Sequence, residues 1–148
     1  EPIIARCFAF AGPYLPLDTH FAIGNFIRDS LKGDFIAVNG DGTPYRSYLY
    51  GADLAFWLLT LLAFGAPLRA YHVGSEHSLS VGEIAKTVAK TVGQIDKREI
   101  SVRVARVPSA ELPAKYVPST ARTRSEFNLR ENFSLEESIE FTTQWCRA

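Results

Sequence analysis

The 148-residue sequence contains no methionine and only two cysteines, Cys7 and Cys146, which stand near opposite ends of the chain. So little cysteine excludes a disulfide-rich scaffold and a four-cysteine metal site, and it is typical of the reducing cytoplasm, where we expect this protein to reside. A coding sequence begins with methionine, yet this one opens on Glu1-Pro2 and runs directly into apolar residues. We therefore expect the chain to be part of something larger.

Neither charge is in excess, because 16 Lys+Arg balance 16 Asp+Glu and the formal net charge is +0. Proteins that bind nucleic acid usually carry a basic excess, so we expect no nucleic-acid partner. The longest apolar run, Leu54–Phe64, is interrupted only by Thr60. It is well short of the roughly 18 residues that suggest a membrane span, so we expect no membrane partner. With 47% hydrophobic residues, the sequence predicts one globular domain over residues 1–148.

Strand-like and helix-like segments alternate along the whole chain, which predicts an α/β fold. Ile3–Phe10 is expected to be a buried strand, and Asn39–Gly42 a hairpin turn from which Tyr45–Tyr50 returns. The other expected strands are Phe35–Val38, Ala70–Val73 and Ser101–Val107, and Pro108–Pro118 is expected to be a loop.

Five helices are expected, two of them opened by capping boxes at Ser80–Glu83 and Ser134–Glu137. Asp18 can cap the first helix, and Ala52–Phe64 is so apolar that it should be buried on several sides. The helix that Ser80 opens carries its apolar residues on one face and is followed by Gly93. The last helices are expected around Ala121–Phe127 and after Ser134, with Leu135, Ile139 and Trp145 pointing inward.

No catalytic or metal centre is visible in the residues themselves. His72 and His77 have a poor spacing for a shared metal ion, and no G-x-S-x-G nucleophile elbow is present. Asp41 and Asp53 can pair as acid and base, but turn formation and helix capping explain them more simply. Gly40-Asp41-Gly42 lacks the six-residue glycine fingerprint that binds a pyrophosphate.

Arg46 is the strongest candidate binding residue. A guanidinium beside turn glycines and between aromatic residues suits a bidentate contact with phosphate. The alternative is that Arg46 is an ordinary cross-strand surface residue. The start of the helix after Asp18 offers a second place where backbone N–H groups can meet an anion.

Taken together, the motifs resemble the C-terminal part of extended short-chain dehydrogenases, in the subgroup of NAD-dependent nucleotide-sugar epimerases and dehydratases such as dTDP-glucose 4,6-dehydratase. The resemblance covers nearly the whole chain, and the order and spacing of the motifs make it specific. The segments that carry it are Ile4–Phe8 with Gly12-Pro13, Gly40–Ala55, Tyr71–Ser75, Ser80–Ala85, and the end of the chain from Lys115-Tyr116 through Leu129 to Trp145.

This resemblance implies an α/β substrate-binding portion whose N-terminal Rossmann segment is absent. In the family, that segment carries the glycine fingerprint for NAD and a Tyr-x-x-x-Lys pair, neither of which occurs here. It implies transient oxidation at C4 of a nucleotide-linked hexose in the parent enzyme, with NAD as cofactor. No residue of this chain would be catalytic, and the chain alone would be inactive.

Carried over position by position, the resemblance implies that Arg46 grips the pyrophosphate of a nucleotide-sugar. Phe8 would approach the nicotinamide at the end of its strand. The remaining substrate-binding candidates are His20, Phe21, Asn39, Ser80, Lys115 and Tyr116. Packing is the alternative role for His20, Phe21 and Tyr116.

Several positions depart from the family pattern. Ala9 stands where an asparagine is usual, Ser47 replaces an aspartate, His72 replaces an asparagine, and Lys115 replaces an arginine. Pro44 likewise replaces a glutamine. A reductase or decarboxylase of the same architecture stays open, and so does a binding or assembly domain that has lost the chemistry. The strand Ile3–Phe10 would have an open edge, so we expect self-association and, for the intact protein, a homo-oligomer.

Overall fold

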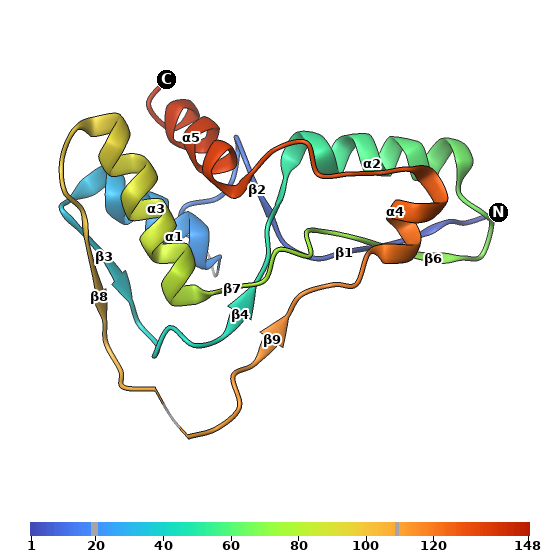
Figure 1. Cartoon of the computed structure of the whole chain (residues 1–148). Coiled ribbons are helices and arrows are strands. Elements are labelled where there is room, and N and C mark those ends of the chain that lie inside the picture. Colours follow the sequence, from blue (N-terminus) through green and yellow to red (C-terminus); the bar gives the residue numbers. More distant parts are fainter. Residues whose placement is uncertain (19–20, 109) are drawn as a thin grey trace.

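The computed structural model describes residues 1–18, 21–108 and 110–148. Figure 1 shows helices α1 and α3 with strands β3 and β8 at one end of the molecule, and helices α2 and α4 with strands β1 and β6 at the other. Short strands β4, β7 and β9 lie between them. The helices are α1 (Ala22–Lys32), α2 (Gly51–Phe64), α3 (Val81–Asp96), α4 (Ala121–Phe127) and α5 (Leu135–Trp145). The strands are β1 (Ile4–Cys7), β2 (Phe10–Ala11), β3 (Phe35–Val38), β4 (Tyr45–Arg46), β5 (Leu49–Tyr50), β6 (Ala70–Val73), β7 (Leu79–Ser80), β8 (Ser101–Val104) and β9 (Lys115–Tyr116).

The first hydrophobic core lies between α1, α3, α5 and strand β3. Ile27 from α1, Val88 from α3 and Ile139 from α5 are fully buried in it. The expected apolar face of α3 is confirmed, because Ile84, Ala85, Val88 and Val92 are all buried. This helix continues past Gly93 to Asp96 and ends on Lys97, which adopts a left-handed conformation.

The second core forms where α2 packs against β6, which is paired in parallel with β1. Trp57 and Leu61 of α2 pack there with Tyr71 and Val73 of β6. Strand β1 was expected to be buried, but all four of its residues are exposed. The reason is that β1 pairs with β6 on one edge and has no second strand partner in residues 1–18, 21–108 and 110–148.

The expected hairpin is wrong. β3 pairs in parallel with β8, and β4 pairs instead with β7 and β9, so Asn39–Gly42 connects two different sheets. The expected strand Tyr45–Tyr50 is interrupted and divides into β4 and β5, while the expected loop Pro108–Pro118 contains β9. Gly42 has φ +77° and its carbonyl accepts a 2.9 Å hydrogen bond from the Gly82 N–H, which draws this connection against the start of α3.

Local sequence signals predict the starts of two helices correctly and the start of a third wrongly. Both expected capping boxes are present, with Ser80 paired to Glu83 and Ser134 paired to Glu137. Asp18 does not cap α1, because the helix begins later and its N-cap is Phe21, which makes no side-chain capping bond. Trp145 is 43% exposed rather than inward and stacks on Tyr14, with ring centroids 4.3 Å apart.

Helix α2 is buried on one side only, contrary to expectation. Asp53, Trp57 and Leu61 are its buried residues. The opposite side is also apolar yet exposed, and Leu59 and Leu62 are 64% and 74% exposed. A surface helix of a globular protein normally carries polar residues there, so this side of α2 is an unusually apolar surface.

Two adjacent leucines of α2 test which side of this helix stabilises the folded protein. Replacing Leu61, 1% exposed, by alanine should lower the free energy of unfolding by about 2–5 kcal/mol, because it leaves a cavity in the second core. Leu62→Ala removes the same atoms from a side chain 74% exposed and should cost less than about 0.5 kcal/mol. Urea unfolding of the two variants checks this, and equal losses would contradict the arrangement.

Candidate substrate-binding site

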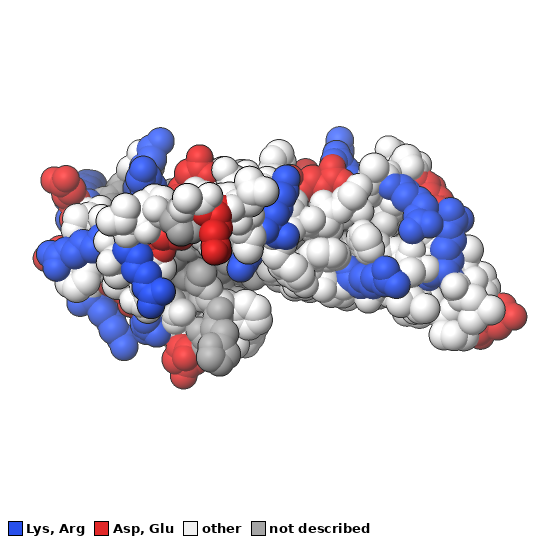
Figure 2. All heavy atoms as spheres, turned by 90° about the horizontal axis from the view of Figure 1, so that it is seen from below, with Lys and Arg blue, Asp and Glu red and all other residues white. Residues whose placement is uncertain are grey.

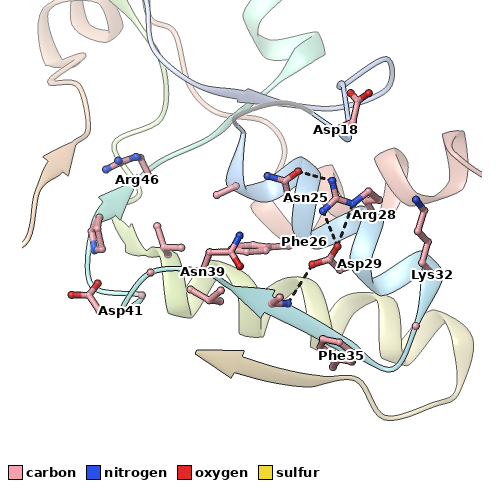
Figure 3. Close-up of a pocket in the computed structure, with 18 residues that line it drawn as sticks. Asp18, Asn25, Phe26, Arg28, Asp29, Lys32, Phe35, Asn39, Asp41 and Arg46 are labelled. Atoms are coloured by element: carbon pink, nitrogen blue, oxygen red, sulfur yellow. Dashed lines mark hydrogen bonds and ion pairs between the residues drawn. The ribbon is translucent and has the colours of Figure 1, made fainter. Parts of the chain in front are cut away.

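A groove of about 930 Å³ runs between α1 and the segment from β3 to β4. Figure 3 shows the side chains of α1 forming one wall, with Asn39 and Asp41 on the other side and Arg46 at one end. The amphipathic pattern of α1 explains its wall: Ile23 and Ile27 turn into the core, while the polar residues Asn25, Arg28, Asp29 and Lys32 turn toward the groove. These α1 side chains were not predicted as site residues, although their spacing on one helix face is readable in the sequence.

Most of the polar groups of the α1 wall already bind one another. The Arg28 guanidinium contacts the Asp29 carboxylate at 2.9 Å and donates to the Asn25 side-chain oxygen at 3.0 Å. It also donates to the Leu17 carbonyl at 3.1 Å, while Asp29 accepts from the Ala37 N–H at 3.3 Å. This network ties α1 to the chain before it and to β3, so it holds the groove in shape.

The two candidate acid–base aspartates have structural partners. Asp41 accepts hydrogen bonds from the Thr43 N–H at 3.0 Å and the Thr43 hydroxyl at 2.9 Å, which is an Asx turn. Asp53 is 2% exposed and accepts from the Asn132 N–H at 2.9 Å and the Asn132 side-chain amide at 2.7 Å. Asp41 shapes a turn, as expected, whereas Asp53 anchors a distant backbone segment instead of capping its own helix.

Arg46 occupies the middle strand of the β7–β4–β9 sheet. It stands opposite Leu79 of β7 on one side and Tyr116 of β9 on the other. One guanidinium nitrogen donates to the Tyr45 carbonyl at 2.7 Å, which, among the described residues, leaves the other donors of the fork for a ligand. Burial raises the pKa of the Tyr48 phenol. A hydrogen bond from the Ile23 N–H and the nearby positive charge of Arg46 both oppose that rise.

The same sheet gathers predicted residues that are distant in sequence. Tyr45 is paired with Ser80 on one side and Lys115 on the other, so Arg46, Ser80, Lys115 and Tyr116 all lie on three adjacent strands. Lys115 and Tyr116 are exposed, whereas the Ser80 hydroxyl is engaged with Glu83 in the capping box. Ser80 therefore fixes the start of α3.

Phe8 connects this sheet to the β1–β6 pair. Its ring centroid lies 5.0 Å from that of Tyr116 and 5.4 Å from that of His72. His72 Nδ1 is 3.0 Å from the Ser119 carbonyl, which holds the imidazole in place. The C-terminal ends of β1 and β6 and strand β9 therefore meet around one aromatic cluster, at the sheet edge where open α/β proteins bind ligands.

The other predicted residues are distributed differently. Asn39 lines the groove, and Phe21 lies at the N-cap of α1 with 46% of its surface exposed but does not line the groove. His20 lies outside the described residues. Ser47, at the position of the usual aspartate, is 3% exposed, and its hydroxyl finds no partner in the part of the chain that the structure describes.

Positive and negative side chains are mixed on the surface of the molecule. Figure 2 shows Lys and Arg interspersed with Asp and Glu across the face in view. Within the described ranges, no group of three His, Cys, Asp or Glu residues is arranged to hold a metal ion. None of the described helices is both long enough and apolar enough to cross a membrane.

The position of the chain after β9 depends on Glu76. This carboxylate accepts hydrogen bonds from the Thr120 N–H and from the Thr120 hydroxyl, the latter at 3.1 Å, and it lies 3.5 Å from Arg124. The Thr120 backbone bond is the largest influence, and together these contacts hold the pKa of Glu76 below its usual value. The ionised form of Glu76 thus fastens the start of α4 beside the end of β6.

This anchor predicts an acid-sensitive contribution to stability. Because the folded-state pKa of Glu76 is lowered, its contribution is fully present above the unfolded-state pKa of about 4.5 and is lost as pH falls through the lower folded-state value. Glu76→Gln should therefore destabilise the protein at pH 7 and have a smaller effect at pH 3. Denaturant unfolding at the two pH values measures the difference, and a penalty that does not change with pH would contradict it. Glu136→Gln, an exposed glutamate on α5, is the control.

Comparison with known proteins identifies the family. The sequence profile of the NAD dependent epimerase/dehydratase family matches residues 1–74. The chain belongs to this family. It is 28% identical over 139 residues to UDP-glucuronic acid decarboxylase 4 of Arabidopsis thaliana, a match that covers 94% of this chain and 30% of the relative. UDP-N-acetyl-alpha-D-glucosaminuronate decarboxylase of Bacillus cytotoxicus is 26% identical and is covered over 46% of its length.

Solved structures share the fold. UDP-glucose 4-epimerase of Thermotoga maritima, crystallised with UDP-glucose, superposes with a TM-score of 0.79 at 20% identity. The match covers 98% of this chain and 45% of that one. The dTDP-glucose 4,6-dehydratase of Bacillus anthracis, solved with NAD, gives a TM-score of 0.76 and is covered over 44% of its length. The chain therefore spans less than half of each of these four proteins.

Proposed function

We propose that this chain is the substrate-binding portion of an NAD-dependent nucleotide-sugar epimerase/dehydratase that acts by transient oxidation at C4 of the hexose. The observation that carries the proposal is the position of Arg46, which lines the groove and stands in register with Tyr116 on the adjacent strand β9. Membership of the family supports it. Residues 1–148 would form one functional unit of a cytoplasmic enzyme.

In this proposal the nucleotide occupies the groove and its two phosphates lie at Arg46. A guanidinium fork can bind two phosphate oxygens at once. Lys115 is in register with Tyr45 rather than with Arg46, which places it on the opposite face of the sheet, so we assign the phosphate contact to Arg46 alone. Asn39 offers an amide beside the nucleoside end of the groove. The sugar would extend past Tyr116 toward Phe8, because the rings of these two residues are in contact.

The residues present fit only part of NAD. Phe8 and the C-terminal ends of β1 and β6 offer an edge for the nicotinamide, but the sequence has no glycine fingerprint to hold the dinucleotide phosphates. The chain also has no Tyr-x-x-x-Lys pair. We therefore assign substrate binding to this chain, expect it to be inactive alone, and derive no chemical step through NAD from its residues.

A non-catalytic binding or assembly domain is the second candidate. Ala9 favours it, because this side chain is 9% exposed in the first core and cannot replace the hydrogen bonds of the asparagine usual at that position. Turnover separates the two candidates. An intact protein that binds nucleotide-sugars but never converts them in the presence of NAD would be such a domain.

Arg46→Ala tests the phosphate contact. Loss of a charged hydrogen-bond partner costs about 1.5–3 kcal/mol, so affinity for UDP-glucose or UDP-glucuronic acid should fall roughly 10- to 150-fold. Isothermal titration calorimetry measures the change, and Arg106→Ala, an exposed arginine near the end of β8, is the matched control. Unchanged affinity in Arg46→Ala would show that Arg46 is only a surface residue.

A further inference from the structure

A second pocket, of about 550 Å³, shares only Arg46 with the groove. Two segments distant in sequence form its walls, residues 75–79 and residues 131–137, and Ser47 and Tyr48 complete its lining. Its volume is within the range of small-molecule sites. The proposed function does not use this pocket, so its contents need a separate explanation.

The walls of this pocket are held in place by hydrogen bonds. The buried carboxylate of Asp53 accepts from the Asn132 N–H at 2.9 Å, which fixes the wall of residues 131–137. Glu131 accepts from the Glu76 N–H at 3.4 Å and so joins this wall to the opposite one. The pocket is therefore formed before any ligand arrives, as small-molecule sites usually are.

Ser47 gives the pocket a buried hydroxyl that has no partner. This residue is 3% exposed, and its hydroxyl makes no hydrogen bond within the part of the chain that the structure describes. Buried polar groups nearly always have a partner, so an unpaired one in the lining of a pocket marks a place for a bound molecule. Thr143 carries another unpaired buried hydroxyl, but it does not line the pocket.

Negative charge is in excess around the pocket. Glu131, Glu136 and Glu137 line it, whereas Arg46 and His77 are the basic residues in its lining. None of the ion pairs among the described residues includes these three glutamates. Over the same residues, no three His, Cys, Asp or Glu side chains are arranged to hold a metal ion. The charge therefore suits an organic cation, which can span carboxylates too dispersed for a single ion.

The rest of the lining is largely apolar. Ile84 is 0% exposed and Tyr48 is 9% exposed, and both belong to the first core. The main apolar side chains that line the pocket are Tyr48, Leu79, Ile84 and Leu135. An alkyl chain can pack against these side chains while a charged group at its end reaches the glutamates.

We propose that this pocket binds an aliphatic amine, whose ammonium groups contact the glutamate carboxylates and donate to the Ser47 hydroxyl oxygen. An ammonium group has three donors and no acceptor, so it can bond to a carboxylate and a hydroxyl at once. The amine would thus supply the partner that Ser47 lacks and balance the excess negative charge. This inference does not rest on the proposed function.

The probe is putrescine, a four-carbon diamine, titrated into the isotope-labelled 148-residue chain and followed by nuclear magnetic resonance. The amide signals of residues 47, 75–79 and 131–137 should shift together and saturate. The neutral four-carbon diol should leave them in place. Equal binding of the diol would show that charge is not recognised, and equal shifts with magnesium chloride would show that the carboxylates attract any cation. Either result would overturn the proposal.

Two variants test the contacts. Ser47→Ala should weaken putrescine binding about fivefold, and Glu131→Gln, which keeps an oxygen for the Glu76 N–H, about tenfold. Because the Ser47 hydroxyl has no protein partner, Ser47→Ala should leave the urea unfolding midpoint of the free chain unchanged or higher. The matched control is Thr143→Val, which removes the other unpaired hydroxyl and should not change binding. Unchanged affinity in both test variants would contradict the proposal.

Arg46→Ala distinguishes this pocket from the phosphate contact, because Arg46 lines both the pocket and the groove. Removing its positive charge should weaken UDP-glucose binding and strengthen putrescine binding. Weaker putrescine binding in Arg46→Ala would show that the pocket does not recognise a cation. Putrescine is titrated without nucleotide-sugar, so unchanged UDP-glucose affinity in this variant would disprove the proposed function and leave the amine pocket in place.

Discussion

The pairing of β4 on both of its edges is the constraint on which the site depends. β4 is only two residues long, yet it is antiparallel to β7 on one side and parallel to β9 on the other. β7 leads directly into α3, the central helix of the first core, and the chain after β9 is fastened by Glu76 to the end of β6. Arg46 is therefore held by segments that belong to both ends of the molecule, and its position is set by long-range packing.

Local chemistry made much of the fold predictable. The capping boxes at Ser80 and Ser134 predicted the starts of two helices correctly, because each motif satisfies its own backbone donors without help from the rest of the chain. The apolar periodicity of α3 likewise predicted its buried face. The α/β class followed from the alternation of such segments, and the structural neighbours confirm it.

Pairing between distant segments was not predictable in the same way. Asn39–Gly42 has the composition of a hairpin turn, which predicts that the strands on either side of it pair with each other. Instead, β3 pairs with β8, which comes more than sixty residues later. The exposure of α2 has a related cause: its apolar composition predicted burial on several sides, but the described residues cover only one. In the site, Arg46 was a candidate from its neighbouring glycines and aromatic residues, and Lys115 and Tyr116 came from the resemblance. The wall of Asn25, Arg28 and Asp29 required knowing where α1 lies.

The contacts between Asp53, Trp57 and the segment before α5 have a consequence for the order of folding. Asp53 accepts from Asn132, 79 residues later, and the Trp57 indole donates to the Arg130 carbonyl, 73 residues later. Contacts between residues so far apart in the chain slow folding, because a long loop must close, at a cost in entropy, before these contacts can form. During synthesis on the ribosome, α2 emerges before Arg130 and Asn132, so Asp53 and the Trp57 indole bond to water until that segment appears. A nascent chain stalled after α3 could already pack Trp57 against Tyr71 and Val73, but it would lack the polar contacts that fasten α2 to the end of the chain.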